Sequence, residues 1–504
     1  MTSEPLATFD GHDAVGLAGL VAAGEVQSTE LVDAAIERIE SINPSINAVI
    51  ATDYDAARAL AVEGPPAGPF CGVPILIKDL MPIAGEKVAF GSVFLRDFVP
   101  DFTPEVMRRI CHAGFIPIGR TNSPEFGLLP TTESTLYGST RNPWDLTRSS
   151  GGSSGGAAAA VAAGIVPLAQ GSDGGGSIRI PASACGVFGL KPSRGRNPRL
   201  PAATSDYLAV DLGLSRSVRD SAALLDVIHG PEPGSGYWAP PPPAPFASAL
   251  DADPAPLTIA YSTHDYRGNR VHPNSKEGVL STARLLEGLG HRVVEAAPPL
   301  DGEIMAEAFM EVWASLAAGV FQIILDGAQD HRLGQLMRRV LGDWRAMKVI
   351  ARLDRRKSGL DAFEPFTWGL VDRSRKRTPA HLDQAKKALQ QASHQLGEFL
   401  EEHDFMLTPV LGTPPVPLGR IDQRRDWDEL IEELLTYVPF TPLANFTGLP
   451  AMSVPLHWGA SGLPVGSHFL GRFGDEFGLL RLAGQLERAR PWADRRPSIP
   501  TGSV

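Results

Sequence analysis

Two serines in this chain stand in glycine clusters, where their hydroxyl groups could do chemistry. Ser153 lies in Gly151-Gly152-Ser153-Ser154-Gly155-Gly156, and Ser177 directly follows Gly174-Gly175-Gly176. A serine hydroxyl is a poor nucleophile until a base removes its proton. Successive backbone N–H groups in a glycine-rich turn form a concavity that binds an anion, as a developing oxyanion requires. The two clusters are therefore two candidate nucleophile turns.

Other interpretations of the glycine clusters fit less well. No Gly-Lys-Ser/Thr follows the glycines, as a Walker A phosphate loop would need, and neither cluster reads G-x-G-x-x-G. The segment 151–155 does match the nucleophile-elbow pattern G-x-S-x-G, which favours Ser153, but residues 142–148 before it are not an apolar strand. A flexible linker would not lead directly into 157–163, an alanine-rich helix former.

A lysine at the end of an apolar segment is the candidate base. Residues 73–77 are typical of a fully buried strand, and Lys78 follows with apolar neighbours on nearly every side. Lysines are almost never fully buried without a reason. Either Lys78 reaches the surface where the strand ends, or burial lowers its pKa and makes a neutral amine available as a base.

Strands and helices alternate around these residues and must position them. Strands are expected at 73–77 and 115–119, with an amphipathic helix at 102–114 between them. The segment 257–295 has a strand–helix–strand pattern. This alternation predicts the α/β class. The segment 231–256 is rich in proline, and its composition alone would favour a domain boundary near residue 240.

The composition of the chain argues against several partners. Its 504 residues are 43% hydrophobic and 20% charged, which is ordinary for a soluble globular protein, and the net charge of −11 argues against nucleic acid. The basic residues of 338–357 are expected to form a solvated helix face. The longest small-apolar run, 157–169, is too short to span a bilayer. No signal peptide is evident, and Cys71, Cys111 and Cys185 show no metal spacing, so we expect a cytoplasmic protein without a membrane partner.

Several ordered motifs give the chain a resemblance to the amidase signature family. They are G-V-P-x-x-x-K-D at 72–79, T-R-N-P-W at 140–144, G-G-S-S-G-G at 151–156, G-S-D-x-G-G-S-I-R-x-P at 171–181 and C-G-V-x-G-L-K-P at 185–192. The resemblance continues weakly in 440–451 and 462–466. It implies one α/β domain over residues 1–504, with a central mixed β-sheet flanked by helices on both faces. The core signature region would be 72–195, and the divergent substrate-pocket region about 300–440.

The resemblance also implies roles for the three side chains. Ser177 would be the nucleophile, Lys78 the base, and Ser153, usually preceded by a cis peptide bond in this family, would relay the proton between them. The residue types agree with these roles, because no histidine lies in a nucleophile-like motif and a hydroxyl can both donate and accept a proton. The amide would acylate Ser177 and water would then hydrolyse the acyl-enzyme, with no metal or organic cofactor implied.

The loop around Ser177 would stabilise the tetrahedral intermediate. The backbone N–H groups of Gly174, Gly175, Gly176 and Ser177 are expected to bind its oxyanion. Two residues of opposite charge, Asp173 and Arg179, flank this loop. We expect them to pair and hold the loop rigid, the alternative being that both are merely solvated.

The substrate is less well specified by the sequence. The motifs are most similar to those of bacterial amidases that act on nylon oligomers and aryl acylamides, or of relatives that act on carbamates. Leu128 and Leu129 are candidates for an apolar acyl pocket and are equally typical of a core. Four tryptophans of the divergent region are each more typical of the core than of a pocket, namely Trp313, Trp344, Trp368 and Trp427.

Two other functions stay open at this point. The chain could be the A-type subunit of an amidotransferase, which liberates ammonia from glutamine for a tRNA-bound substrate and needs partner subunits. It could also be a catalytically silent binding protein on the same scaffold, although intact Lys78, Ser153 and Ser177 speak against this. Otherwise the expected partner is a small-molecule amide, and the protein is expected to be a monomer or a homodimer.

Overall fold

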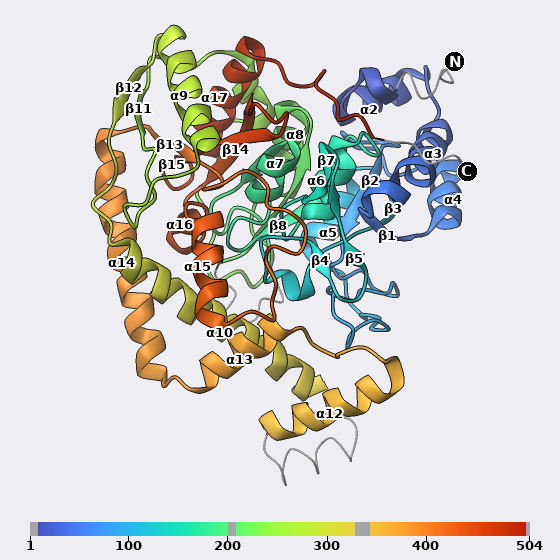
Figure 1. The fold of residues 1–504 in the computed structure, drawn as a ribbon. Coiled ribbons are helices and arrows are strands. Elements are labelled where there is room, and N and C mark those ends of the chain that lie inside the picture. The colour runs from blue at the N-terminus through green and yellow to red at the C-terminus, as the bar shows by residue number, and fades with distance from the viewer. Residues whose placement is uncertain (1–8, 200–207, 328–342, 500–504) are drawn as a thin grey trace.

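A single mixed β-sheet forms the centre of the computed structural model, which describes residues 9–199, 208–327 and 343–499 (Figure 1). Its eleven strands have the order β1-β3-β2-β8-β10-β9-β14-β15-β13-β11-β12. Their bounds are β1 Val49–Thr52, β2 Pro74–Lys78, β3 Ile116–Thr121, β8 Leu168–Asp173, β9 Phe188–Lys191, β10 Val210–Ser215, β11 Thr258–Tyr261, β12 Arg292–Glu295, β13 Phe405–Pro409, β14 Ala451–Trp458 and β15 Pro464–Gly471. Two short ribbons accompany it, β4 Glu133–Ser134 with β5 Gly138–Ser139 and β6 Arg141–Asn142 with β7 Asp145–Ser149.

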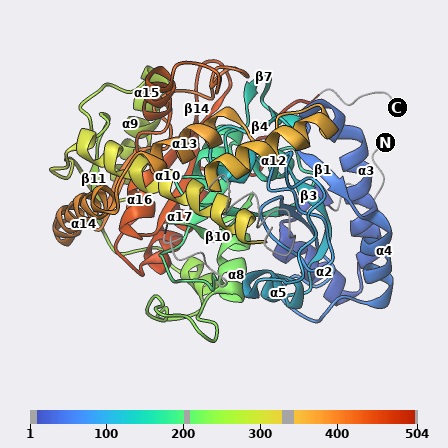
Figure 2. The ribbon, with the colours of Figure 1, turned by 90° about the horizontal axis from the view of Figure 1, so that it is seen from below.

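Helices flank the sheet and complete the predicted α/β fold (Figures 1 and 2). Their bounds are α2 Ala14–Ala23, α3 Ser28–Ile46, α4 Tyr54–Glu63, α5 Glu105–His112, α6 Gly155–Ala162, α7 Arg179–Cys185, α8 Val218–Ile228, α9 Pro273–Gly288, α10 Gly302–Gly327, α12 Asp343–Ser358, α13 Pro365–Arg375, α14 Pro379–Glu402, α15 Trp427–Tyr437, α16 Pro442–Thr447 and α17 Glu476–Ala489. Three of them, α10, α12 and α13, lie together at the lower end of the molecule in Figure 1 and in front in Figure 2. The prediction of a mixed sheet between helices is confirmed.

The strands that carry the candidate residues are neighbours in this sheet. β2 runs parallel to both β3 and β8, so the carboxyl ends of β2 and β8 lie at the same edge. All five residues of β2 are buried, as the continuous apolar run of a central parallel strand predicts. Lys78 at the end of β2 and Asp173 at the end of β8 are thereby brought to one place.

Small residues let α6 pack tightly beside this edge. All eight of its residues are buried, and they are only glycine, alanine and one valine. A Cβ at Gly156 would lie 2.5 Å from the backbone nitrogen of Asn122 and 2.6 Å from the carbonyl oxygen of Ala48. The glycines before the alanine run are therefore part of the packing and do not form a linker.

Two expectations about the elements need correction. The helix expected at 102–114 is α5, which begins only at Glu105 because Pro104 occupies its N-cap. It ends before Gly114, whose φ of +93° is outside the helical region. The boundary near residue 240 that composition alone favoured does not divide the sheet, since β10 and β11 on either side of it belong to the same sheet. The shared sheet supports one domain over residues 1–504, which stays a prediction.

One described helix, α10, is long and apolar enough to cross a membrane by length and composition. Its stretch Gly302–Ile323 has a mean hydropathy of 1.4, and 44% of the most apolar part is buried inside the protein. Core helices pass the same test, and α10 packs along α13 and α14. The expectation of no membrane partner therefore stays a prediction.

Candidate active site

Lys78 is completely buried and is surrounded by serine hydroxyls. Its side chain has 0% exposure, so the alternative in which it reaches the surface is wrong. Its Nζ donates to Ser153 Oγ at 2.8 Å, to Ser154 Oγ at 2.8 Å and to Ser172 Oγ at 3.1 Å. Burial lowers the pKa of Lys78 to about 7, although the Asp211 carboxylate acts in the opposite direction. Near neutral pH a large share of the amine is therefore uncharged.

Ser153 is held against Lys78 by a tightly packed turn. The peptide bond between Gly152 and Ser153 is cis, as the resemblance implied. A Cβ at Gly152 would lie 2.7 Å from the backbone of Thr131, and a Cβ at Gly127 would lie 3.0 Å from Ser153 Oγ. Only residues without a side chain fit at these two positions. The hydroxyl of Ser153 is therefore fixed beside the lysine by its neighbours.

The loop with Ser177 lies next to this turn. The Ser154 N–H donates to the Ser177 carbonyl oxygen at 3.2 Å, so the two glycine clusters are joined directly. Ser177 has 7% exposure, whereas Ser153 has 2% and Lys78 none. Within the described ranges, the Ser177 hydroxyl has no hydrogen-bond partner. The structure thus brings Lys78, Ser153 and Ser177 together, with Ser177 the most accessible of the three.

The backbone N–H groups of the glycine loop are not equivalent. The Gly176 N–H donates to Asp173 Oδ1 at 2.8 Å, and the Ile178 N–H donates to Asp173 Oδ2 at 3.1 Å. In the part of the chain that the structure describes, the N–H groups of Gly174, Gly175 and Ser177 have no acceptor. The expectation for Gly176 therefore changes, because its N–H is already taken by a carboxylate.

Asp173 and Arg179 form a fully buried ion pair below the loop. Arg179 Nη2 lies 2.9 Å from Asp173 Oδ1, and Arg179 Nε lies 3.0 Å from Oδ2. Burial raises the pKa of Asp173, but the Arg179 guanidinium more than offsets this, so the pKa lies well below its usual value. Arg179 Nη1 also donates to His468 Nε2 at 2.9 Å. The expected pairing is confirmed, and the solvated alternative is wrong.

Two residues that sequence reasoning missed also contact the loop. Thr441 Oγ1 donates to the Gly175 carbonyl oxygen at 2.7 Å. Asn445 Nδ2 donates to the Asp173 carbonyl oxygen at 3.0 Å, and its Oδ1 accepts from Arg179 Nη2 at 2.7 Å. The only sequence signal for these residues was the weak family resemblance of 440–451.

An aromatic wall from α10 stands beside the same loop. The Phe309 and Trp313 rings stack at 5.5 Å. A Cβ on Gly174 would lie 3.4 Å from Trp313 Cη2. A Cβ on Gly175 would lie 3.3 Å from Phe309 Cζ. Trp313 therefore lies at the candidate site, which its sequence position alone did not indicate.

Leu128 and Leu129 belong to the hydrophobic cluster next to this wall. Both are buried, and they pack in one cluster with Ile180 and residues of α10 and α13. Trp313 Nε1 donates to the Leu128 carbonyl oxygen at 3.2 Å. The two leucines thus lie close to the loop and also contribute to a core, so a role in an acyl pocket stays a prediction.

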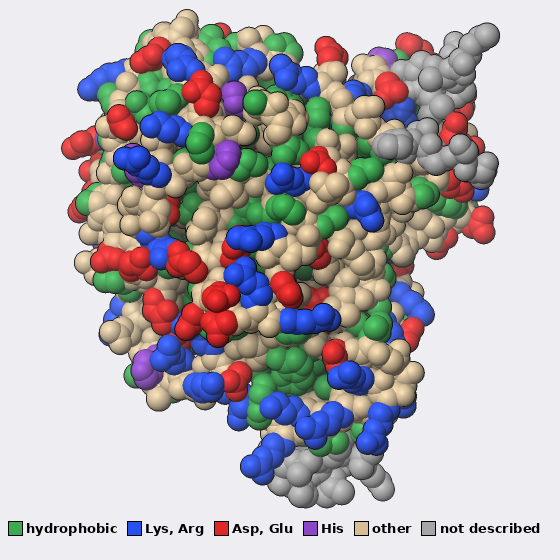
Figure 3. Space-filling view, in the orientation of Figure 1, with side chains coloured by type: hydrophobic (Ala, Val, Ile, Leu, Met, Phe, Trp, Pro, Cys, Tyr) green, Lys and Arg blue, Asp and Glu red, His purple; other side chains and the backbone are tan. Residues whose placement is uncertain are grey.

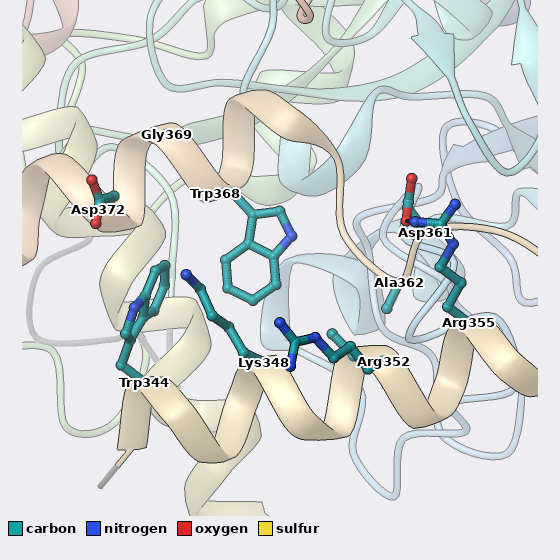
Figure 4. Close-up of a pocket in the computed structure, with 10 residues that line it drawn as sticks. Trp344, Lys348, Arg352, Arg355, Asp361, Ala362, Trp368, Gly369 and Asp372 are labelled. Atoms are coloured by element: carbon teal, nitrogen blue, oxygen red, sulfur yellow. Dashed lines mark ion pairs between the residues drawn. The ribbon is translucent and has the colours of Figure 1, made fainter. Parts of the chain in front are cut away.

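A separate cavity of about 570 Å³ lies between α12 and α13 (Figure 4). Trp344 and Trp368 meet there edge to face with their centroids 5.1 Å apart, beside Lys348 and Arg352. None of the candidate catalytic residues lines it. The basic side chains described on α12 are exposed and lie at the lower end of the view in Figure 3, which confirms the solvated face for 343–357, whereas 338–342 lie outside the described residues.

Comparisons with known proteins agree with the motifs. The family model described as Amidase matches residues 30–480. The chain is 34% identical over 503 residues to the 6-aminohexanoate-cyclic-dimer hydrolase of Paenarthrobacter ureafaciens, covering 97% of each chain. A solved 6-aminohexanoate cyclic dimer hydrolase complexed with substrate matches with a TM-score of 0.85 and 33% identity, over 96% of this chain and 98% of that one. A bacterial aryl acylamidase of the amidase signature family matches with a TM-score of 0.82 and 27% identity, over 96% and 97%.

Proposed function

This chain belongs to the amidase family and is a hydrolase of carbon–nitrogen bonds other than peptide bonds, and from this premise we propose that it cleaves small, apolar amides through an acyl-enzyme at Ser177. One observation carries the proposal. Lys78 is fully buried, has a pKa of about 7 and donates to the Ser153 hydroxyl at 2.8 Å. The next residue, Ser154, donates its N–H to the carbonyl oxygen of Ser177, whose hydroxyl is free. The proposal assigns Lys78 the role of base, Ser153 that of relay and Ser177 that of nucleophile.

The proposed reaction begins with the neutral amine of Lys78. Ser153 gives its proton to Lys78 Nζ and takes the proton of Ser177, whose oxygen attacks the carbonyl carbon. The carbonyl electron pair moves onto oxygen, and the N–H groups of Gly174, Gly175 and Ser177 stabilise the resulting charge. The intermediate collapses, the carbon–nitrogen bond breaks, and the amine leaves with a proton returned through Ser153.

The second half of the proposed cycle repeats these steps with water. A water molecule takes the place of the amine, loses a proton to the same relay and attacks the acyl carbon. The ester bond to Ser177 breaks, the carboxylic acid leaves, and Ser177 recovers its proton. The chain's own side chains supply every proton transfer, so the proposal needs no cofactor.

The surroundings of the loop support an apolar acyl group. The rings of Phe309 and Trp313 lie beside Gly174 and Gly175. Leu128 accepts a hydrogen bond from Trp313 through its carbonyl oxygen. Aromatic rings bury large apolar areas, and the N–H of Trp313 already has a partner in the Leu128 carbonyl oxygen. We therefore propose a linear, cyclic or aryl amide, or the related carbamate, with Leu128 and Leu129 lining the acyl pocket. The similarity to an enzyme named for a cyclic amide dimer supports the same class.

Glutamine hydrolysis for a tRNA-dependent amidotransferase is the alternative. Glutamine carries a charged amino acid head, and a site for it needs polar partners for that head. The aromatic rings beside the loop favour the apolar amide instead. A silent scaffold would have no use for a buried lysine in contact with the hydroxyls of Ser153 and Ser154. The single domain, the cytoplasmic location and the state as a monomer or homodimer stay predictions.

The test is a substrate panel on the purified protein alone. It contains an aryl anilide, a cyclic amide, a simple carbamate and glutamine, each assayed for release of the amine or ammonia. A serine-directed phosphonate is applied in parallel, with Ser177→Ala as the control. Turnover of an apolar amide or carbamate together with labelling of Ser177 supports the proposal. Turnover of glutamine alone would favour the amidotransferase, and neither turnover nor labelling would favour the silent scaffold.

A further inference from the structure

Two side chains near α16 hold backbone carbonyl groups of the loop that carries Ser177. Thr441 Oγ1 donates to the Gly175 carbonyl oxygen at 2.7 Å, and Asn445 Nδ2 donates to the Asp173 carbonyl oxygen at 3.0 Å. Both side chains are buried. They come from a segment about 265 residues further along the chain, as the separation of 266 between Thr441 and Gly175 shows. The proposed reaction gives neither of them a task.

Because the peptide bond is planar, a contact that fixes the direction of a carbonyl group also fixes the direction of the N–H group in the same peptide unit. In a trans peptide the carbonyl of one residue and the N–H of the next lie in one plane and point in opposite directions. The only cis peptide bond among the described residues is the one before Ser153. Asn445, by holding the Asp173 carbonyl, therefore sets the direction of the Gly174 N–H. Thr441, by holding the Gly175 carbonyl, sets the direction of the Gly176 N–H.

The Gly176 N–H shows the effect of this control. It points at Asp173 Oδ1, to which it donates at 2.8 Å, and away from the open side of the loop. Gly176 has a φ of +131°, and a Cβ there would lie 2.2 Å from Thr441 Oγ1. Thr441 thus occupies the place of a side chain at 176 and fixes the turn between the free N–H groups of Gly175 and Ser177.

Asn445 connects this turn to the buried ion pair. Its Nδ2 also donates to Asp173 Oδ1 at 2.8 Å, while its Oδ1 accepts from Arg179 Nη2 at 2.7 Å. One amide therefore contacts the backbone carbonyl, the carboxylate and the guanidinium around the loop. Donation to a carbonyl also polarises its peptide unit, which strengthens the N–H on the other side as a donor.

We propose that Thr441 and Asn445 are positioning residues that aim the N–H groups of the 174–177 loop at the transition-state oxyanion. The inference rests on the proposed acyl transfer to Ser177. It assigns them no contact with the substrate and no proton transfer. Their loss should therefore weaken binding of the transition state and leave binding of the ground-state amide almost unchanged, which lowers kcat but not KM.

Thr441→Val is the sharpest test, because it has nearly the same shape and removes only the hydroxyl. Its kcat is expected to fall roughly tenfold, less than the ~10²–10³ that follows removal of a direct oxyanion donor, with KM within about twofold. Thr441→Ser keeps the hydroxyl and should restore most of kcat. Thr447→Val is the matched control at the other end of α16, since the Thr447 hydroxyl donates to the Leu443 carbonyl oxygen and accepts from the Leu449 N–H, neither of which belongs to the 174–177 loop. All variants are compared for Tm.

A second measurement separates positioning from a merely structural role. An aldehyde analogue of the best substrate forms a tetrahedral adduct with the serine, whereas the product carboxylate does not. Thr441→Val should weaken binding of the aldehyde by the same factor as it lowers kcat, and it should leave binding of the carboxylate unchanged. Wild-type kcat and aldehyde affinity in Thr441→Val, or an equal loss in Thr447→Val, would overturn the inference while phosphonate labelling of Ser177 upholds the acyl-enzyme. Absence of labelling in the wild-type protein would instead overturn the proposed function, and this inference with it.

Discussion

Ser153 and Ser154 are adjacent in the chain, and both hydroxyls lie 2.8 Å from Nζ of Lys78. Their other contacts differ. Ser154 Oγ also donates to the Ser172 carbonyl oxygen at 3.2 Å, whereas Ser153 Oγ has no other partner in the described residues. Of these two hydroxyls, only that of Ser153 has no further acceptor among the described residues, as the proposed relay requires.

This difference predicts unequal effects of two matched substitutions. Ser153→Ala should lower the rate of acylation by about 10²–10⁴, the usual contribution of a positioned proton-transfer group. Ser154→Ala should lower it much less, because Lys78 and Ser153 keep their contact. Single-turnover rates with the best substrate of the panel measure both. Equal losses in the two variants would count against Ser153 as the relay.

The buried lysine predicts how the rate depends on pH. Only the neutral amine can accept a proton, and burial places the pKa of Lys78 at about 7, down from 10.5. The value of kcat/KM should therefore rise with pH, level off above about 7, and fall about tenfold per pH unit well below it. Lys78→Met should remove the activity while the protein stays folded. A midpoint near 10, as for an exposed lysine, would contradict the assignment.

The pair of Asp173 and Arg179 predicts a large stability difference between two Asp→Asn changes. Asp173→Asn leaves the buried Arg179 without its carboxylate and should cost about 3–5 kcal/mol of unfolding free energy. Asp97→Asn removes a carboxylate that is 72% exposed and pairs with Lys87, and it should change the stability little. Urea denaturation of the three proteins measures the difference. Equal stability of both variants would show that the buried pair contributes no more to the free energy of unfolding than an exposed pair does.

A buried carboxyl group beside the site predicts how stability depends on pH. Glu125 accepts hydrogen bonds from Ser92 Oγ and from Thr367 Oγ1, and from the N–H of Glu364. Burial, and then the Glu364 carboxylate, raise its pKa above 4.5. The folded state therefore keeps a proton that the unfolded state has lost. Its contribution to stability is fully present below about pH 4.5 and is lost as the pH rises through the folded pKa.

Glu125→Gln tests this dependence, because an amide mimics the protonated carboxyl and does not titrate. The variant should lose less stability than the wild type between pH 5 and about 8.5, measured by urea denaturation. Glu63→Gln, at the exposed end of α4, controls for removing a carboxylate in general. A wild-type slope in Glu125→Gln would show that other groups cause the dependence.

The aromatic wall predicts a change in substrate preference. Trp313→Ala should raise KM for an aryl amide about tenfold, because it removes apolar surface beside the loop, and should change KM for acetamide little. Trp344→Ala is the matched control, since this ring lines the separate cavity between α12 and α13. Equal changes in both variants, or none in Trp313→Ala, would remove Trp313 from the substrate pocket.

Local patterns in the sequence predicted the class of the fold, whereas a joint site of Lys78, Ser153 and Ser177 was implied by the resemblance to the amidase signature family. The apolar run before Lys78 identified a central strand, and the dense glycines identified two tight turns. The use of the Gly176 N–H by Asp173 could not be predicted, because it depends on the φ of +131° at one residue. The contacts of Thr441 and Asn445 with the loop could not be predicted for another reason. Beyond the weak family resemblance of 440–451, an ordinary threonine and asparagine in a remote segment carry no pattern that indicates a role, and only the fold brings them to the loop.

The late position of β14 and β15 in the sequence has a consequence for synthesis. The described strands of the first 215 residues form one side of the sheet, and β9 is its last strand in space. The outer edge of β9 pairs with β14, and β14 and β15 arrive with residues 451–471. At about 5–20 residues per second, a ribosome needs roughly 12–50 seconds between these points. For that time the nascent chain carries an open strand edge that can pair with another chain. Thr441 and Asn445 emerge just before those strands, so the two proposed positioning residues are absent from the nascent chain for most of the same period.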